Sequence, residues 1–125
     1  MVPLLLVMAG GAIGAASRFA TARALLAITG PGWPWGTLAV NLVGGFGMGL
    51  LAGGLLRAGG GGEWLRLFAG VGVLGGFTTF SAFSLDAALM MERGAVVAAA
   101  GYVALSVAGS IAALFAGLAL MRIAA

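Results

Sequence analysis

Long apolar stretches alternate with short polar or glycine-rich segments along the whole chain. The separators are a turn signal over residues 29–32, a glycine tract over residues 59–62 and the sequence Glu92-Arg93-Gly94. The apolar stretches between them cover residues 2–28, 35–56, 64–91 and 95–121. Tryptophans stand at the expected helix ends, where we interpret them as interface anchors: Trp33, Trp35 and Trp64. Because roughly 20 residues cross a bilayer as a helix, the pattern predicts an all-α integral membrane protein. Its four transmembrane helices would form a single transmembrane domain over residues 1–125.

The third apolar stretch carries an interruption near its middle. Gly75 and Gly76 are adjacent, and hydroxyl residues follow at Thr78 and Thr79. These residues are poor material for an uninterrupted membrane helix, and irregular backbone survives in hydrocarbon only where it is buried in protein or lines a cavity. The sequence therefore predicts that the third helix is broken near mid-membrane and that the break marks a functional site.

Composition supports the membrane assignment and excludes several kinds of chemistry. Of the 125 residues, 62% are hydrophobic and 7% charged, with a mean hydropathy of +1.19, whereas soluble domains have about 25% charged residues. The net charge of +3 comes from scattered arginines that form no patch for nucleic acid. There is no cysteine and no histidine, so disulfides, thiolate metal sites and the usual general base are absent. We expect no enzymatic activity and no organic cofactor.

The arginines near the helix ends give almost no preferred orientation. Four spans would place Arg57, Arg66 and Arg122 on one side, and Arg93 with Arg23 on the other. Orientation follows the asymmetry of such residues, and three against two is a weak bias. Insertion in both orientations, with two copies paired antiparallel about an axis in the membrane plane, is one hypothesis. A single orientation set by one or two arginines is the other.

Glycines recur at helical spacing in the first two stretches. Gly10 and Gly14 lie four residues apart, as do Gly45, Gly49 and Gly53. Small residues at this spacing let helix backbones approach closely in lipid. We interpret these glycines as packing surfaces rather than ligand contacts, and they favour an oligomer of closely packed helices.

The polar groups expected inside the hydrocarbon are few and mostly uncharged. Tyr102, Ser106 and Ser110 are four residues apart and share a helix face, and Asn41 lies within the second stretch. Isolated hydroxyls usually bond to their own helix carbonyl, but this alignment favours a track for water or an ion.

The character of this track suits an anion. It offers neutral donors, and Arg18 is the only cation well inside a span, while Asp86 is the only intramembrane acid. Phe80 and Phe83 are three residues apart and share a face just after the expected break. Aromatic rings have positive edges, so edges turned toward a passage would favour a small anion.

Three segments carry a family resemblance that covers nearly the whole chain. They are Gly10-Gly11-Ala12-Ile13-Gly14-Ala15-Ala16-Ser17-Arg18, then Gly36-Thr37-Leu38-Ala39-Val40-Asn41, then residues 75–84. In order and spacing they resemble the signature of the Fluc (CrcB-type) fluoride channels. The resemblance implies an antiparallel, dual-topology homodimer with two pores that exports fluoride passively across the cytoplasmic (inner) membrane and gives fluoride resistance.

The resemblance also implies roles for individual residues. Asn41 corresponds to the pore amide donor, and Phe80 and Phe83 to an aromatic pair whose ring edges meet fluoride. The polar track corresponds to Thr79, Ser81, Tyr102, Ser106 and Ser110, and the vestibule arginine to Arg18. Gly75 and Thr78 correspond to positions whose backbone carbonyls hold a structural sodium ion at the dimer interface.

Two positions depart from the family pattern, and two other functions compete with the channel. Ala82 replaces the usual threonine or serine, and Asp86 replaces a longer glutamate. A small four-helix multidrug exporter would need an embedded glutamate in the first span, which here carries Arg18 and no acid. A non-conducting assembly protein of the bilayer would show no ion flux and no penalty for changing Asn41.

Overall fold

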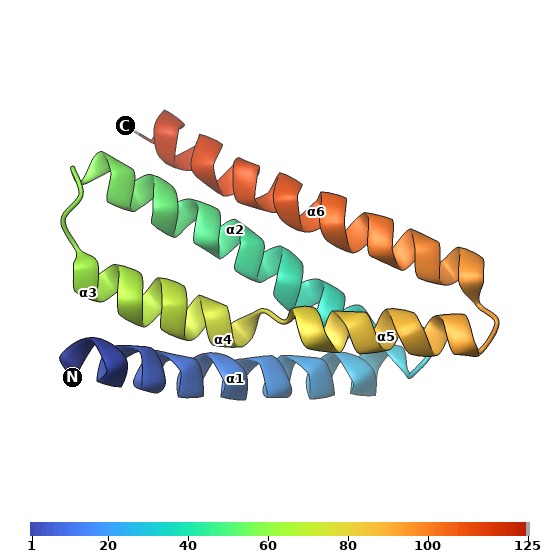
Figure 1. Ribbon diagram of the computed structural model, residues 1–125. Coiled ribbons are helices and arrows are strands. Elements are labelled where there is room, and N and C mark those ends of the chain that lie inside the picture. The colour runs from blue at the N-terminus through green and yellow to red at the C-terminus, as the bar shows by residue number, and fades with distance from the viewer. Residues whose placement is uncertain (125) are drawn as a thin grey trace.

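The computed structural model describes residues 1–124, and the regular structure of that part of the chain is helical. Four helical segments are long and apolar enough to cross a membrane: Val2–Thr29 (α1), Trp35–Arg57 (α2), Glu63–Glu92 and Val96–Ile123 (α6). Their bounds lie within two residues of the expected spans. The segments run alternately up and down, so that both chain termini and the link after α2 lie at one end (Figure 1). The chain is therefore built as a multi-pass membrane protein.

The third segment consists of several pieces rather than one regular helix. These are α3 (Glu63–Leu65), the π-helical η1 (Arg66–Leu74), α4 (Gly75–Phe77) and α5 (Phe80–Glu92). Between α4 and α5 the backbone is extended, with φ −85° and ψ 159° at Thr78 and φ −152° and ψ 125° at Thr79. The helix is thus interrupted for two residues, directly after the short piece α4 that holds the paired glycines and Phe77.

The interruption lets the third segment exchange packing partners along its length. Before it, η1 and α4 pack against α1, whereas after it α5 packs against α6. Helix α2 contacts both α1 and α6 as well as the pieces on either side of the interruption. The two extended residues therefore lie where α2 meets the point of exchange.

Glycines make the close approach between these helices possible. A Cβ atom added at Gly10 or Gly14 would collide with the main chain of η1, and one at Gly45, Gly49 or Gly53 would collide with α6. The interpretation of both glycine series as packing surfaces is confirmed.

Glycine and proline residues mark the boundaries of the long helices. The chain leaves α1 at Gly30, whose φ of 77° favours glycine, and Pro31 follows. Pro34 precedes α2. Gly94, with a φ of 84°, forms the tight turn between α5 and α6.

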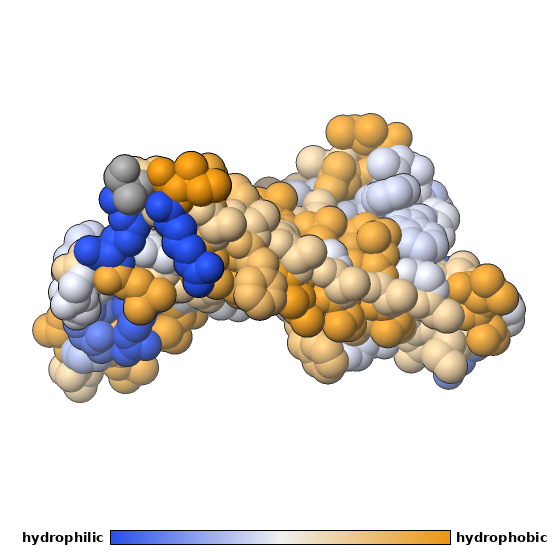
Figure 2. All heavy atoms as spheres, turned by 90° about the horizontal axis from the view of Figure 1, so that it is seen from above, coloured by the Kyte–Doolittle hydropathy of each residue, from blue (hydrophilic) through white to orange (hydrophobic). Residues whose placement is uncertain are grey.

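Little of the apolar surface is buried within the chain. One small core cluster lies between α2, α5 and α6: Leu38, Phe83, Ala87, Met90, Ala99 and Tyr102. Most other large apolar side chains point outward, and hydrophilic residues gather at the end that holds the termini (Figure 2). Such an apolar exterior suits lipid or a further protein copy and not water.

Candidate functional site

Asn41 binds the interrupted backbone with both ends of its side-chain amide. Its Nδ2 donates to the carbonyl oxygen of Thr79 at 3.0 Å, and the Thr79 N–H donates to its Oδ1 at 2.8 Å. These two main-chain groups have lost their helical partners, and an unpaired buried backbone group is costly. Asn41 therefore fixes the extended backbone against α2.

Hydroxyl side chains satisfy further backbone groups around the interruption. Thr78 Oγ1 donates to the Leu74 carbonyl at 2.9 Å, which closes the end of the preceding helix. Thr79 Oγ1 accepts from the Ala82 N–H at 3.1 Å and so caps the start of α5. The hydroxyl of Ser81 lies 3.3 Å from that of Thr79.

Arg18 of α1 binds the backbone of α4, just before the same interruption. Its Nε donates to the carbonyl oxygen of Gly76 at 3.0 Å, and the side chain is partly buried. The expected position for this residue was a vestibule, and in the isolated chain its guanidinium is bound to the last turn before the interruption. Arg18 lines neither of the two polar cavities described next.

A groove of about 430 Å³ brings together most of the residues that the sequence singles out. Its polar and aromatic lining comes from α2, from the interruption with α5, and from α6: Asn41, Thr78, Thr79, Phe80, Phe83, Ser106 and Ser110. Ser106 is buried, and its hydroxyl has no partner among the described residues. The groove therefore combines an amide, several hydroxyls and two aromatic rings.

The aromatic rings continue from this groove into the core. Phe80 is 77% exposed and Phe83 is buried, with ring centroids 5.5 Å apart. Phe83 lies 5.3 Å from Tyr102, which in turn meets Trp33 edge-on at 5.7 Å. Trp33 thus packs against the core, which the interpretation as an interface anchor missed, and its buried indole N–H has no partner among the described residues.

Tyr102 and Ser81 stand beside the groove rather than in its lining. Tyr102 is fully buried, and its hydroxyl donates to Oδ2 of Asp86 at 3.1 Å. The sequence offers no partner for Asp86, because the two residues come from different helices and only the packing of α5 on α6 brings them together.

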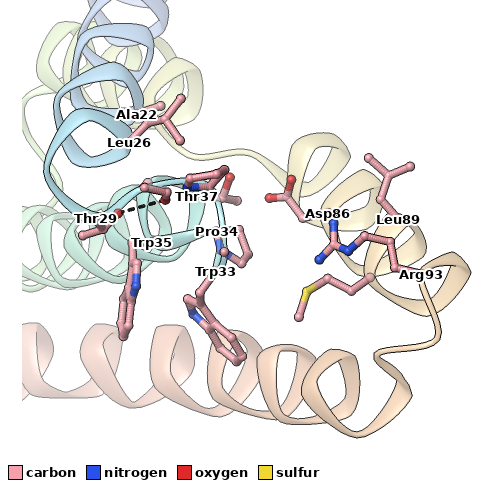
Figure 3. Close-up of a pocket in the computed structure, with 15 residues that line it drawn as sticks. Ala22, Leu26, Thr29, Trp33, Pro34, Trp35, Thr37, Asp86, Leu89 and Arg93 are labelled. Atoms are coloured by element: carbon pink, nitrogen blue, oxygen red, sulfur yellow. Dashed lines mark hydrogen bonds between the residues drawn. The ribbon is translucent and has the colours of Figure 1, made fainter.

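A second polar cavity, which we call the link cavity, lies between the α1–α2 link and α5. It has a volume of about 250 Å³, and its charged lining residues are Asp86 and Arg93, with Thr37 contributed by α2. The side chains of all three residues surround the open space in Figure 3. In the sequence, Arg93 stands out only as a charge at a helix end.

Gly75 lies on a different surface from the rest of the expected site. It lines an apolar cavity of about 900 Å³ formed by α2, the glycine-rich link and η1. Thr78, the other expected sodium ligand, lines the groove that holds Asn41. Among the described residues no group of three or more histidine, cysteine or acidic side chains is arranged to hold a metal ion.

The four apolar segments, with a groove that holds an amide and several hydroxyls at a helix interruption, define a small, helical, multi-pass membrane protein. Residues 5–118 match the model of the family described as "CrcB-like protein, Camphor Resistance (CrcB)", and the chain belongs to this family.

Several proteins similar to this chain have a name that specifies an ion. A protein of Phenylobacterium zucineum is 59% identical over 98% of this chain and 97% of its own length. One of Sphingopyxis alaskensis is 56% identical over 93% and 92%, and one of Mesorhizobium japonicum 55% identical over 98% of both chains. Each of the three is named "Fluoride-specific ion channel FluC". These relatives are ion channels and not enzymes.

Proposed function

We propose that this protein is a fluoride-selective channel that releases fluoride passively across the cytoplasmic (inner) membrane and so gives fluoride resistance. The observation that carries the proposal is the groove, which gathers uncharged donors and aromatic rings at a helix interruption. Relatives more than half identical over nearly the whole chain are named fluoride-specific channels.

The chemistry of the groove fits a small, strongly hydrated anion. A lone buried ion costs tens of kcal/mol by Born estimates, so donors must replace the water shell while still letting the ion leave. One amide hydrogen of Asn41 is bound to Thr79, and a side-chain amide has a second. This second amide hydrogen and the unpartnered Ser106 hydroxyl supply neutral donors beside the rings of Phe80 and Phe83.

The remaining polar residues act next to these donors. In the proposal, Thr79 and Ser110 provide further hydroxyl donors along the groove. The Ser81 hydroxyl, which lies next to that of Thr79, helps to hold it in place. Tyr102 ends the track at its buried hydroxyl. Arg18 serves the vestibule through the positive charge that it holds near the interruption.

We place the interruption at mid-membrane, as the break of a third transmembrane helix. We further propose that two chains form an antiparallel, dual-topology homodimer with two pores. The 77% exposure of Phe80 supports pairing, because an aromatic ring of the groove then gains a covering partner. The apolar cavity beside Gly75 offers a further surface for a second copy. A structural sodium ion would be held at that interface by the backbone carbonyls of Gly75 and Thr78.

Fluoride release from liposomes that contain the purified protein tests the function. We expect rapid fluoride loss without a proton gradient and no comparable loss of chloride. Phe80→Ile should slow fluoride release strongly, because an aliphatic side chain has no positive ring edge. Phe115→Ile, the same change at an exposed position of α6 outside the groove, should release fluoride like the unaltered protein. Equal fluxes of fluoride and chloride would reject a selective channel.

Labelling of single cysteines in intact cells tests the dual topology. The chain has no native cysteine, so Gly61→Cys reports on the end with the termini and Glu92→Cys on the opposite end. With insertion in both orientations, about half of each variant should react with a membrane-impermeant maleimide. Complete labelling of one variant with none of the other would show a single orientation.

A further inference from the structure

The link cavity carries an unpaired positive charge beside a carboxylate. Asp86 lies in α5 and Arg93 is the C-cap residue directly after that helix, seven residues or about two helical turns later, so both lie on the side of α5 that lines the cavity. Their side chains are both directed toward the cavity (Figure 3). Arg93 is exposed, and within residues 1–124 its guanidinium has no hydrogen bond or ion pair, so its charge is free to act on a mobile ion.

A single buried phenol separates this cavity from the groove. Asp86 lines the link cavity and accepts the hydrogen bond from Tyr102, whose ring packs on Phe83 in the lining of the groove. An anion in the link cavity is therefore one side chain away from the donors of the groove.

The electrostatics of the cavity require a positive group if anions pass through it. The Asp86 carboxylate alone would repel an anion, and clefts with walls of low dielectric constant focus such fields. Arg93 is placed to offset this repulsion, since it is the only basic residue among the described residues that line the link cavity.

We propose that Arg93 is the anion-attracting residue of the link cavity, and that small monovalent anions reach the Tyr102 side of the groove through this cavity. The inference rests on the proposed channel function and adds an access route and its controlling residue. Arg93 acts on the rate at which anions arrive and not on the donors that bind them.

Fluoride release at different ionic strengths tests the inference. The screening length is about 30 Å at 0.01 M and about 3 Å at 1 M ionic strength. With the salt of a large, impermeant organic anion setting ionic strength, Arg93→Gln should reduce initial release about twofold to fivefold at low ionic strength and low fluoride concentration. The difference should vanish at high ionic strength or saturating fluoride, and Arg93→Lys should behave like the unaltered protein.

Removing a positive charge far from the link cavity shows whether the effect of Arg93→Gln is local or follows from the lower net charge. Arg122→Gln removes the same charge from an exposed residue at the other end of the chain, away from the link cavity, and should leave release nearly unchanged. Equal release by Arg93→Gln and the unaltered protein at every ionic strength would overturn the inference while the channel function stands. A loss that persists at 1 M salt and in Arg93→Lys would also overturn it, because it would indicate a structural role. Failure of the unaltered protein to release fluoride would instead reject the proposed function and, with it, this inference.

Discussion

Asn41→Leu is expected to reduce fluoride release from liposomes to background and to lower the thermal stability of the purified protein. Leucine is similar in size but cannot bond to the N–H and C=O of Thr79, both of which Asn41 now satisfies. Leaving a fully buried polar group unpaired costs about 1–3 kcal/mol, and here two partly buried groups lose their partner. The change also removes the amide donor from the groove, so both thermal stability and fluoride conduction should fall.

Ser84→Ala is the matched control for Asn41→Leu. The Ser84 hydroxyl donates to the Phe80 carbonyl of its own helix at 2.9 Å and is exposed. Its loss leaves that carbonyl with its helical partner, so release and stability should remain close to those of the unaltered protein. Normal fluoride release by Asn41→Leu would contradict both the structural and the conducting role of Asn41.

The sequence predicts the helices well because each must stay apolar over the length that crosses a bilayer, and such long apolar stretches are easy to recognise. The position of the interruption follows from the adjacent Gly75 and Gly76 and the hydroxyls after them, which are features of local sequence. The sequence also singles out several residues that line the groove, since Asn41 and the serines of α6 are conspicuous among apolar neighbours, but it does not predict that Ser81 and Tyr102 lie beside the lining.

The contacts that the sequence does not predict depend on packing between distant segments. Asn41 bonds to a backbone 38 residues away, and Arg18 to one 58 residues away. Their side chains are polar and therefore noticeable, but their partners are backbone groups that every residue has. The pairing of Tyr102 with Asp86 depends in the same way on how α5 lies on α6. The role of Arg93 depends on a cavity that exists only once the α1–α2 link has folded against α5.

Gly10→Ala and Gly11→Ala should have opposite effects on stability although they add the same methyl group at adjacent positions of α1. At Gly10 the new Cβ would meet the main chain at Phe68, Gly72 and Val73, whereas at Gly11 no described atom beyond the neighbouring residues and the helix's own backbone lies within 4 Å. Alanine in a helix interior is favoured over glycine by roughly 0.5–1 kcal/mol, so Gly11→Ala should be slightly more stable than the unaltered protein.

The cost at Gly10 should exceed this gain, because overpacking a close contact typically costs about 1–3 kcal/mol and the colliding atoms belong to rigid backbone. Displacing η1 from α1 would also move the helix that leads directly into the interruption, so fluoride release should fall along with the melting temperature. Thermal unfolding in detergent and release from liposomes measure the two effects. Equal melting temperatures for the two variants would mean that α1 and η1 do not approach as closely as described, and the packing that positions the groove would then need another explanation.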